Sequence, residues 1–201
     1  MNQERFRPAR KEDCATIAAL YRISSEGIAD YIWSKIAEPG EDVLEVGRRR
    51  YERQGTTFSY ENCTIVEVGG EIAGMLVAFP MHVDPSDEEE RDPVLAPYSK
   101  LEEDASYYIC GMALFPAYRG RGIGTRLLEL AEAHAREKGF DKLSLLVFEH
   151  NAGARRLYQR AGYEEVDRAP LYPHPLVHHT GDVLLMVKRI GMSDTDAVAA
   201  R

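Results

Sequence analysis

The sequence is poor in cysteine and has neither a long apolar run nor an apolar N-terminus. Its three cysteines, Cys14, Cys63 and Cys110, are odd in number and far apart, and no two form a C-x-x-C pair. This spacing argues against a zinc site and against a disulfide framework. No apolar run approaches the roughly 20 residues that span a bilayer, and the first seven residues lack the apolar core of a secretory signal. We therefore expect a reduced, cytoplasmic protein without a membrane partner.

Positive charge is scarce as well. The formal net charge is −8, which argues against general binding of nucleic acid. Residues 84–104 carry nine acidic and two basic residues, whereas residues 119–126 carry three arginines and no acid. The acidic segment has two readings: a solvated loop, the usual role of a charge run, or a cover over a binding cleft that attracts cationic amines. Neutralising Glu88, Glu89 and Glu90 together would separate these readings.

The length of 201 residues suits a single domain over residues 1–190, followed by a flexible tail over 191–201. In the first half, Asp13 is a candidate cap for a helix that contains Ile17, Leu20 and Tyr21. Two further helical regions and a hairpin follow. Their expected ranges are 27–37 and 41–54 for the helices, and 63–68 and 72–79 for the strands around the Gly69-Gly70 turn.

In the second half, residues 80–104 are expected to form a loop with little regular structure. A strand at 107–114, a helix at 124–138 and a continuous apolar strand at 143–148 come next. Asn151 is a candidate cap for a short helix that ends near Ala161-Gly162. A loop rich in proline and histidine at 170–180 leads to a last strand at 183–187.

The strongest local signal is a loop with three glycines in five residues, between the strand at 107–114 and the next helix. Glycines let main-chain N–H groups converge, and a helix N-terminus adds unpaired N–H groups and partial positive charge, so the turn suits a pyrophosphate. A P-loop does not fit, because Thr125-Arg126 follows Gly124, and the G-x-G-x-x-G dinucleotide pattern does not fit either. On the glycines alone, an incidental turn between strand and helix remains an equal alternative.

The wider context favours an acyl-CoA site. Arg119-Gly120-Arg121-Gly122-Ile123-Gly124 matches the R-x-x-G-x-G signature of the Gcn5-related N-acetyltransferase (GNAT) family, which the chain resembles from about residue 6 to residue 188. The segments 151–158 and 161–163 resemble the second landmark of that family. The resemblance implies a mixed α/β fold whose mostly antiparallel central sheet is flanked by helices. It also implies that this sheet is splayed between the strands at about 107–114 and 143–148.

The resemblance implies roles for particular residues. The main chains of Met112 and Leu114 would pair with the pantetheine arm of acetyl-CoA, and Asn151 would hydrogen-bond that arm. Tyr158 would protonate the departing thiolate. The pyrophosphate would be held by the main-chain amides of Arg121, Gly122, Ile123, Gly124 and Thr125, with added contacts from Arg119, Arg121 or Arg126.

Tyr158 also has a plainer reading, as a packing residue on a helix face. We favour the functional role, because Leu157 already offers an apolar side chain for the core contact. The general base is left open among many candidates, or replaced by a water relay. The candidates are Glu103, Asp104, Tyr107, Tyr108, Glu149, His150, His174, His178 and His179. Three histidines in one loop raise the question of a metal, but a solvated loop is the better reading, so we expect no metal. Cys110 reads as a small buried strand residue, since direct transfer needs no covalent acyl-enzyme.

The activity implied is transfer of an acetyl group from acetyl-CoA to a primary amine, by direct attack through a tetrahedral intermediate. One rival is a catalytically silent member that binds acyl-CoA as a sensor or scaffold. Another is a nucleotide-binding module that uses the same glycines. The acceptor, a small molecule or a peptide, is left open, and so is the oligomeric state, with a homodimer as one candidate.

Overall fold

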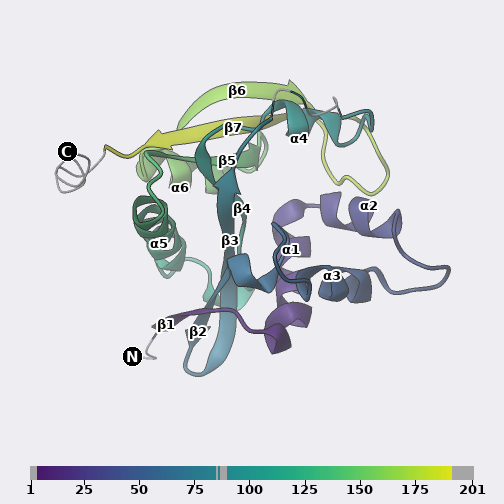
Figure 1. The fold of residues 1–201 in the computed structure, drawn as a ribbon, viewed down its shortest axis with the longest axis horizontal. Coiled ribbons are helices and arrows are strands. Elements are labelled where there is room, and N and C mark those ends of the chain that lie inside the picture. Colours follow the sequence, from purple (N-terminus) through teal and green to yellow (C-terminus); the bar gives the residue numbers. More distant parts are fainter. Residues whose placement is uncertain (1–3, 85, 87–89, 192–201) are drawn as a thin grey trace. The chain divides into compact units, whose positions relative to one another are not determined.

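The computed structural model describes residues 4–84, 86 and 90–191 (Figure 1). Its helices are α1 (Cys14–Ser25), α2 (Ile28–Ser34), α3 (Val43–Tyr51), α4 (Ala96–Lys100), α5 (Ile123–Glu137) and α6 (Ala152–Arg160). Its strands are β1 (Glu4–Pro8), β2 (Cys63–Val68), β3 (Glu71–Met81), β4 (Ser106–Leu114), β5 (Lys142–Phe148), β6 (Glu164–Pro170) and β7 (Asp182–Arg189). Every helix and strand expected from the sequence is present, with ends that differ by a few residues.

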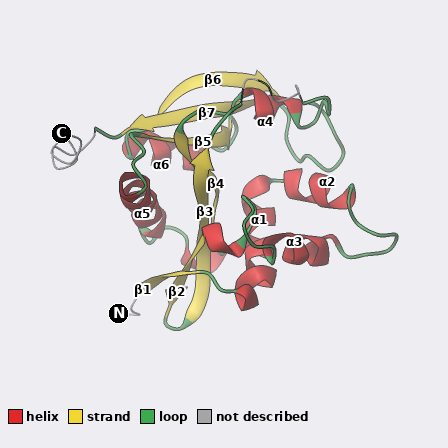
Figure 2. Cartoon of the chain, in the orientation of Figure 1, coloured by secondary structure: helices red, strands yellow, loops and turns green. Residues whose placement is uncertain are grey.

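The strands form one mostly antiparallel sheet in the order β1-β2-β3-β4-β5-β7-β6 (Figure 2). β4 and β5 are its parallel pair, and their ladder runs from Tyr107 opposite Leu143 to Ile109 opposite Leu145. Both strands continue beyond this ladder, to Leu114 and Phe148. The mixed α/β class and the mostly antiparallel sheet are therefore confirmed, and the early end of the ladder is what the expected splay requires.

The chain divides into two compact units. The first comprises residues 1–79, 110–127 and 172–180, and the second comprises residues 80–109, 128–171 and 181–201. The single domain expected over residues 1–190 stays a prediction.

Aromatic side chains form the centre of the first unit. Trp33, the one tryptophan of the chain, is 1% exposed, and its ring centroid lies 6.2 Å from that of Tyr21. Gly47 in α3 makes room for this ring, since a Cβ there would come within 2.6 Å of it. Val46, Gly47 and Tyr51 are the buried residues of α3. A face built from a glycine and a tyrosine explains why α3 lacks a clear apolar periodicity.

The second unit contains the strands β5, β7 and β6. β7 pairs antiparallel with β5 on one side and with β6 on the other. The burial pattern of β5 shows buried residues on both faces, as its apolar sequence predicts. Its polar exception, Ser144, is fully buried and shares a hydrogen bond of 2.6 Å with the hydroxyl of Ser106 in β4. Each buried hydroxyl thus satisfies the other, so neither pays the cost of an unmade hydrogen bond.

Asp13 precedes α1 as expected, but its carboxylate makes no capping hydrogen bond with that helix. It accepts hydrogen bonds from the main-chain N–H of Arg10, at 2.7 Å, and from the guanidinium of Arg7, at 2.7 and 3.0 Å. The expected capping role of Asp13 was therefore wrong, because its carboxylate binds a cation from β1 instead of the first turn of α1.

The segment 80–104 is more regular than expected. β3 continues to Met81, and α4 begins with a proline in its first turn, where a missing N–H costs nothing. Val94 and Leu101 on either side of α4 are buried, so apolar burial orders this part of an otherwise acidic segment.

Two predictions concern residues outside the described part of the chain. Glu88 and Glu89 lie outside it, so the two readings of the acidic segment stay as predictions. Most of the tail expected over 191–201 also lies there. Among the described residues, no helix combines the length and the apolar character that crossing a membrane requires.

Candidate functional site

The glycine-rich turn between β4 and α5 presents a row of free main-chain donors. Gly120 and Gly122 have φ of +74° and +80°, the left-handed region that favours glycine, and no atom lies within 4 Å of where their Cβ would stand. Ile123 is fully buried and anchors the first turn of α5. Within the described part of the chain, the N–H groups of residues 120–124 donate no hydrogen bond. Free main-chain donors at a helix N-terminus are suited to an anion, so this turn is the candidate site for one.

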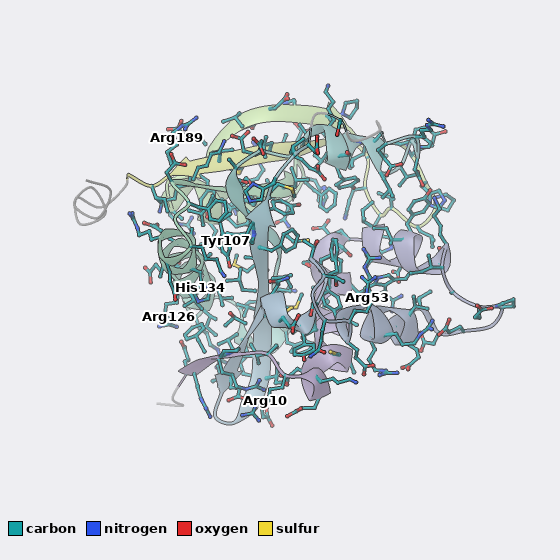
Figure 3. The ribbon with its side chains drawn as sticks, in the orientation of Figure 1. Arg10, Arg53, Tyr107, Arg126, His134 and Arg189 are labelled. Atoms are coloured by element: carbon teal, nitrogen blue, oxygen red, sulfur yellow. The ribbon has the colours of Figure 1, made fainter. Side chains whose placement is uncertain are left out.

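Each of the three expected arginines already has a partner. Arg119 Nε donates to the carbonyl of Leu114 at 3.1 Å. The Arg121 guanidinium donates to Ala117 at 2.8 Å and lies 5.5 Å from the Tyr118 ring centroid. Arg126, which Figure 3 labels beside α5, donates to the Glu4 carboxylate at 2.7 Å. Glu4 could not be predicted as a partner of Arg126, because the contact joins residues 122 positions apart.

Met112 and Leu114 lie near the end of β4 and are half-buried. Gly74 in β3 permits this part of β4 to come close. A Cβ at position 74 would overlap the Ala113 carbonyl oxygen and the Leu114 side chain, and would stand 3.1 Å from Leu114 Cα. Gly74 thus fixes the approach of the two residues whose main chains are expected to meet the pantetheine arm.

Replacing Gly74 by alanine should destabilise the protein by about 1–3 kcal/mol, the usual cost of overpacking a buried site. It should also weaken CoA binding, because Leu114 must shift. Denaturant midpoints and calorimetric titration with CoA would measure both effects. Gly153→Ala is the matched control, since its Cβ meets only Asn151 Oδ1 at 3.8 Å and alanine should stabilise α6 by about 0.5–1 kcal/mol. An unchanged midpoint in Gly74→Ala would contradict this role.

Asn151 is the N-cap of α6, as the sequence predicted. Its side-chain oxygen accepts a hydrogen bond from the N–H of Ala154 at 3.1 Å. Its expected contact with the cofactor arm stays a prediction.

Tyr158 is the buried residue of α6, while Leu157 is half-buried. The argument that Leu157 supplies the core contact was therefore wrong, because the tyrosine takes that place. The Tyr158 ring centroid lies 6.1 Å from that of Tyr163, and burial raises the pKa of Tyr158 to about 12. The phenol stays protonated at neutral pH and can donate a proton or a hydrogen bond.

The carboxylates considered as general bases are engaged elsewhere. Glu103 pairs with Lys142 at 2.5 Å. Asp104 accepts hydrogen bonds from the main-chain N–H groups of Val83 and Ala105, which hold its pKa below the usual value. Glu149 lies 3.3 Å from Arg168. These contacts occupy all three carboxylates, so they disfavour each of them as the proton acceptor.

Two of the three histidines in the loop 170–180 have partners of their own. His174 Nδ1 accepts from the N–H of Leu176 at 3.2 Å, and its ring centroid lies 4.6 Å from that of Tyr31. His179 pairs with Glu26 through Nε2. These contacts hold the loop against α2 and the end of α1 within the first unit.

Cys110 in β4 is half-buried, and its sulfur lies 3.5 Å from the Tyr21 hydroxyl. Burial raises the pKa of this thiol to about 11. At neutral pH it is a thiol rather than a nucleophilic thiolate, which fits the expectation that it forms no acyl-enzyme.

Comparison with known proteins places these features in a family context. A family model described as the acetyltransferase (GNAT) family matches residues 29–163. The uncharacterized N-acetyltransferase YhfO of Bacillus subtilis (strain 168) is 30% identical over 160 residues, which cover 80% of this chain and 89% of YhfO. The chain spans only 38% and 40% of the lengths of two other curated relatives from that organism, YycN and YdgE.

Solved structures show the same fold. An N-acetyltransferase from Staphylococcus aureus Mu50 superposes with a TM-score of 0.61 at 22% identity, covering 91% of this chain and 99% of its own. A GNAT family acetyltransferase from Elizabethkingia anophelis with acetyl-CoA bound gives a TM-score of 0.56 at 16% identity, covering 94% and 100%.

Proposed function

Because the chain belongs to the acetyltransferase (GNAT) family, we propose that it transfers an acetyl group from acetyl-CoA to a primary amine. One observation carries the proposal: the row of free N–H donors over residues 120–124 at the start of α5. These donors fit a pyrophosphate, which brings several acceptor oxygens and negative charge to a helix N-terminus.

The binding roles follow the expectations from the sequence. The amides of residues 121–124 hold the pyrophosphate, and the main chains of Met112 and Leu114 pair with the pantetheine arm. The N–H of Thr125, which was expected to join these amides, already donates to the Gly122 carbonyl at 3.1 Å. Asn151 also hydrogen-bonds this arm. Arg119 is already bonded to the Leu114 carbonyl, so it supports the expected pairing site as well as adding positive charge.

The chemistry requires a neutral amine, a stabilised oxyanion and a protonated leaving group. The amine nitrogen bonds to the thioester carbonyl carbon, and the carbonyl oxygen takes the negative charge. Main-chain N–H groups near Met112 stabilise that oxyanion. Collapse of the tetrahedral intermediate breaks the carbon–sulfur bond, and Tyr158 donates to the departing thiolate. The nitrogen loses its proton to water, since the nearby carboxylates are held by cations and amides.

We also propose that the protein acts in the cytoplasm, alone or as a homodimer. The three cysteines are free thiols, which suits a reducing compartment.

A screen of amines with acetyl-CoA, read by release of the CoA thiol, tests the proposed activity. The expected result is thiol release that depends on both the amine and the protein. CoA binding without turnover of any amine would favour a silent sensor. Displacement of CoA by ATP in a thermal-shift competition would favour a nucleotide-binding module.

A further inference from the structure

Arg50 is a half-buried cation of the first unit that has no counter-ion among the residues the structure describes. Arg50 is the last of three consecutive arginines in α3. Arg48 pairs with Glu45 and Glu52, and Arg49 pairs with Glu41 at 2.7 Å. The Arg50 guanidinium forms no ion pair or hydrogen bond with any residue that the structure describes. Its contact is with the face of Phe58, whose ring centroid lies 4.5 Å from the guanidinium carbon.

The surroundings of Arg50 remove water without supplying a negative charge. Burial lowers the pKa of Arg50, and the positive charge of Arg53 lowers it further. The groups that would raise the pKa of Arg50 are Tyr21, Tyr51 and Cys110. None of them is ionised at neutral pH. A half-buried guanidinium stays charged, and its desolvation is not offset by a carboxylate.

The residue that follows this cation carries a buried donor. The Tyr51 hydroxyl is buried and has no hydrogen-bond partner among the described residues. Burial raises the pKa of this hydroxyl, and the positive charge of Arg50 acts in the opposite direction. Aromatic rings surround the two groups: the Tyr21 centroid lies 5.7 Å from Tyr51 and 6.2 Å from Phe58. A buried polar group without a partner is costly in a native structure. Arg50 and Tyr51 together therefore offer unused donors to an anion.

The shape of the donor set favours a carboxylate. The planar guanidinium fork matches two carboxylate oxygens, and the adjoining aromatic faces suit a planar group. A phosphate carries up to two negative charges and usually gathers several cations, whereas Arg53 is the cation among the described residues whose charge acts on Arg50.

Arg50 and its aromatic neighbours are connected to β4, the strand that is expected to meet the pantetheine arm. The Cys110 sulfur lies 3.5 Å from the Tyr21 hydroxyl, and Cys110 precedes Met112 by two residues in β4. Two residues of strand span about 7 Å. Side chains two residues apart share a face of a strand, so Met112 lies on the face of β4 whose Cys110 contacts Tyr21. The Tyr21 ring in turn borders Tyr51 and Phe58.

We propose that Arg50 binds the carboxylate of the acceptor, so that the acceptor is a free amino acid. This inference rests on the proposed function and names its substrate class. The Tyr51 hydroxyl donates a second hydrogen bond to the same carboxylate, and the rings of Tyr21 and Phe58 exclude water from the pair.

The test compares amino acids with their own carboxamides, which keep the amine and the side chain but lose the negative charge. Thiol release from acetyl-CoA is measured for the twenty amino acids and for the matched amides. At least one acid should have a kcat/KM roughly 10- to 100-fold above that of its amide, the range expected for a charge-assisted hydrogen bond. Arg50→Gln should abolish that preference by raising the KM for the acid far more than the KM for the amide.

Arg53→Gln is the matched control, because it removes a nearby positive charge from an exposed side chain and should preserve the preference. Arg50→Lys keeps the charge without the guanidinium fork and should retain part of the preference for the acid. This variant replaces Arg50→Gln in the test if Arg50→Gln fails to fold. Equal use of acids and amides by the wild type would overturn the inference. So would an equal loss on both substrates in Arg50→Gln, which would mark a packing role against Phe58.

The proposed function can fail separately. If the wild type binds CoA in a thermal-shift assay but acetylates no amino acid, the carboxylate assignment is overturned and the acyl-CoA site stands. If the wild type does not bind CoA, the proposed function is overturned, and the inference falls with it.

Discussion

Replacing Gly122 by valine should abolish CoA binding while leaving the protein folded. The new side chain would stand in the open space before the free N–H groups, where the pyrophosphate is expected, and would block their approach to it. Loss of two or more hydrogen bonds to a charged group predicts an affinity at least about 100-fold lower. Calorimetric titration with CoA measures the affinity, and circular dichroism reports whether the fold survives.

Valine at position 122 also strains the backbone, because Gly122 has φ of +80°, and this strain needs a control. Gly139, just beyond α5, has φ of +77° and likewise has no atom within 4 Å of its Cβ position. Gly139→Val therefore imposes a similar strain of about 1–3 kcal/mol away from the turn. It should lower stability to a similar extent and leave CoA affinity unchanged. Equal affinities in the two variants would remove the pyrophosphate from this turn.

Tyr158→Phe should lower kcat by roughly 10- to 1,000-fold, the effect of losing one general acid or somewhat less. CoA affinity should change little, because the ring remains. A CoA thiol has a pKa near 8.5, so complete proton transfer from a phenol of pKa about 12 is uphill by about 5 kcal/mol. We therefore expect Tyr158 to donate a hydrogen bond that strengthens as the thiolate leaves, rather than to release its proton first.

The raised pKa also sets the pH dependence. A tyrosine whose pKa is raised to about 12 stays protonated as pH rises through 10, where an exposed phenol would ionise. Ionisation of Tyr158 should therefore not lower the kcat of the wild type near pH 10. Any fall in kcat at that pH should also be present in Tyr158→Phe.

Tyr163→Phe is the control for loss of a buried hydroxyl. The Tyr163 hydroxyl has no partner among the described residues, so its removal should leave kcat unchanged and stability equal or higher. Full activity in Tyr158→Phe would reduce Tyr158 to the packing residue that its burial also allows.

Features set by a few neighbouring residues could be predicted from the sequence. The Gly69-Gly70 turn, the Asn151 cap and the glycines before α5 each depend on local backbone preferences. The hairpin and the glycine-rich turn were therefore placed within a few residues of their observed ends. The candidate site is expected to use mainly main-chain groups of this one turn, so its prediction rests on the same local preferences and stays a prediction.

Features set by distant partners could not be predicted. β6 has one buried residue among seven, so it lacks the alternation that marks a strand, and its pairing with β7 defines it. Asp13 binds Arg7 instead of capping α1 for the same reason. Arg50 looked like part of a charged helix, and only the fold separates it from the paired Arg48 and Arg49.

The single tryptophan has a practical consequence for experiments on this protein. Trp33 is buried beside Tyr21, and Tyr21 borders the ring cluster around Arg50. Intrinsic fluorescence excited at the red edge of the absorption band, where tyrosine contributes little, therefore reports on the three helices of the first unit. It carries no signal from the strands β5, β6 and β7. A difference between fluorescence and circular dichroism melting curves would reveal whether the two compact units unfold separately, without any added label.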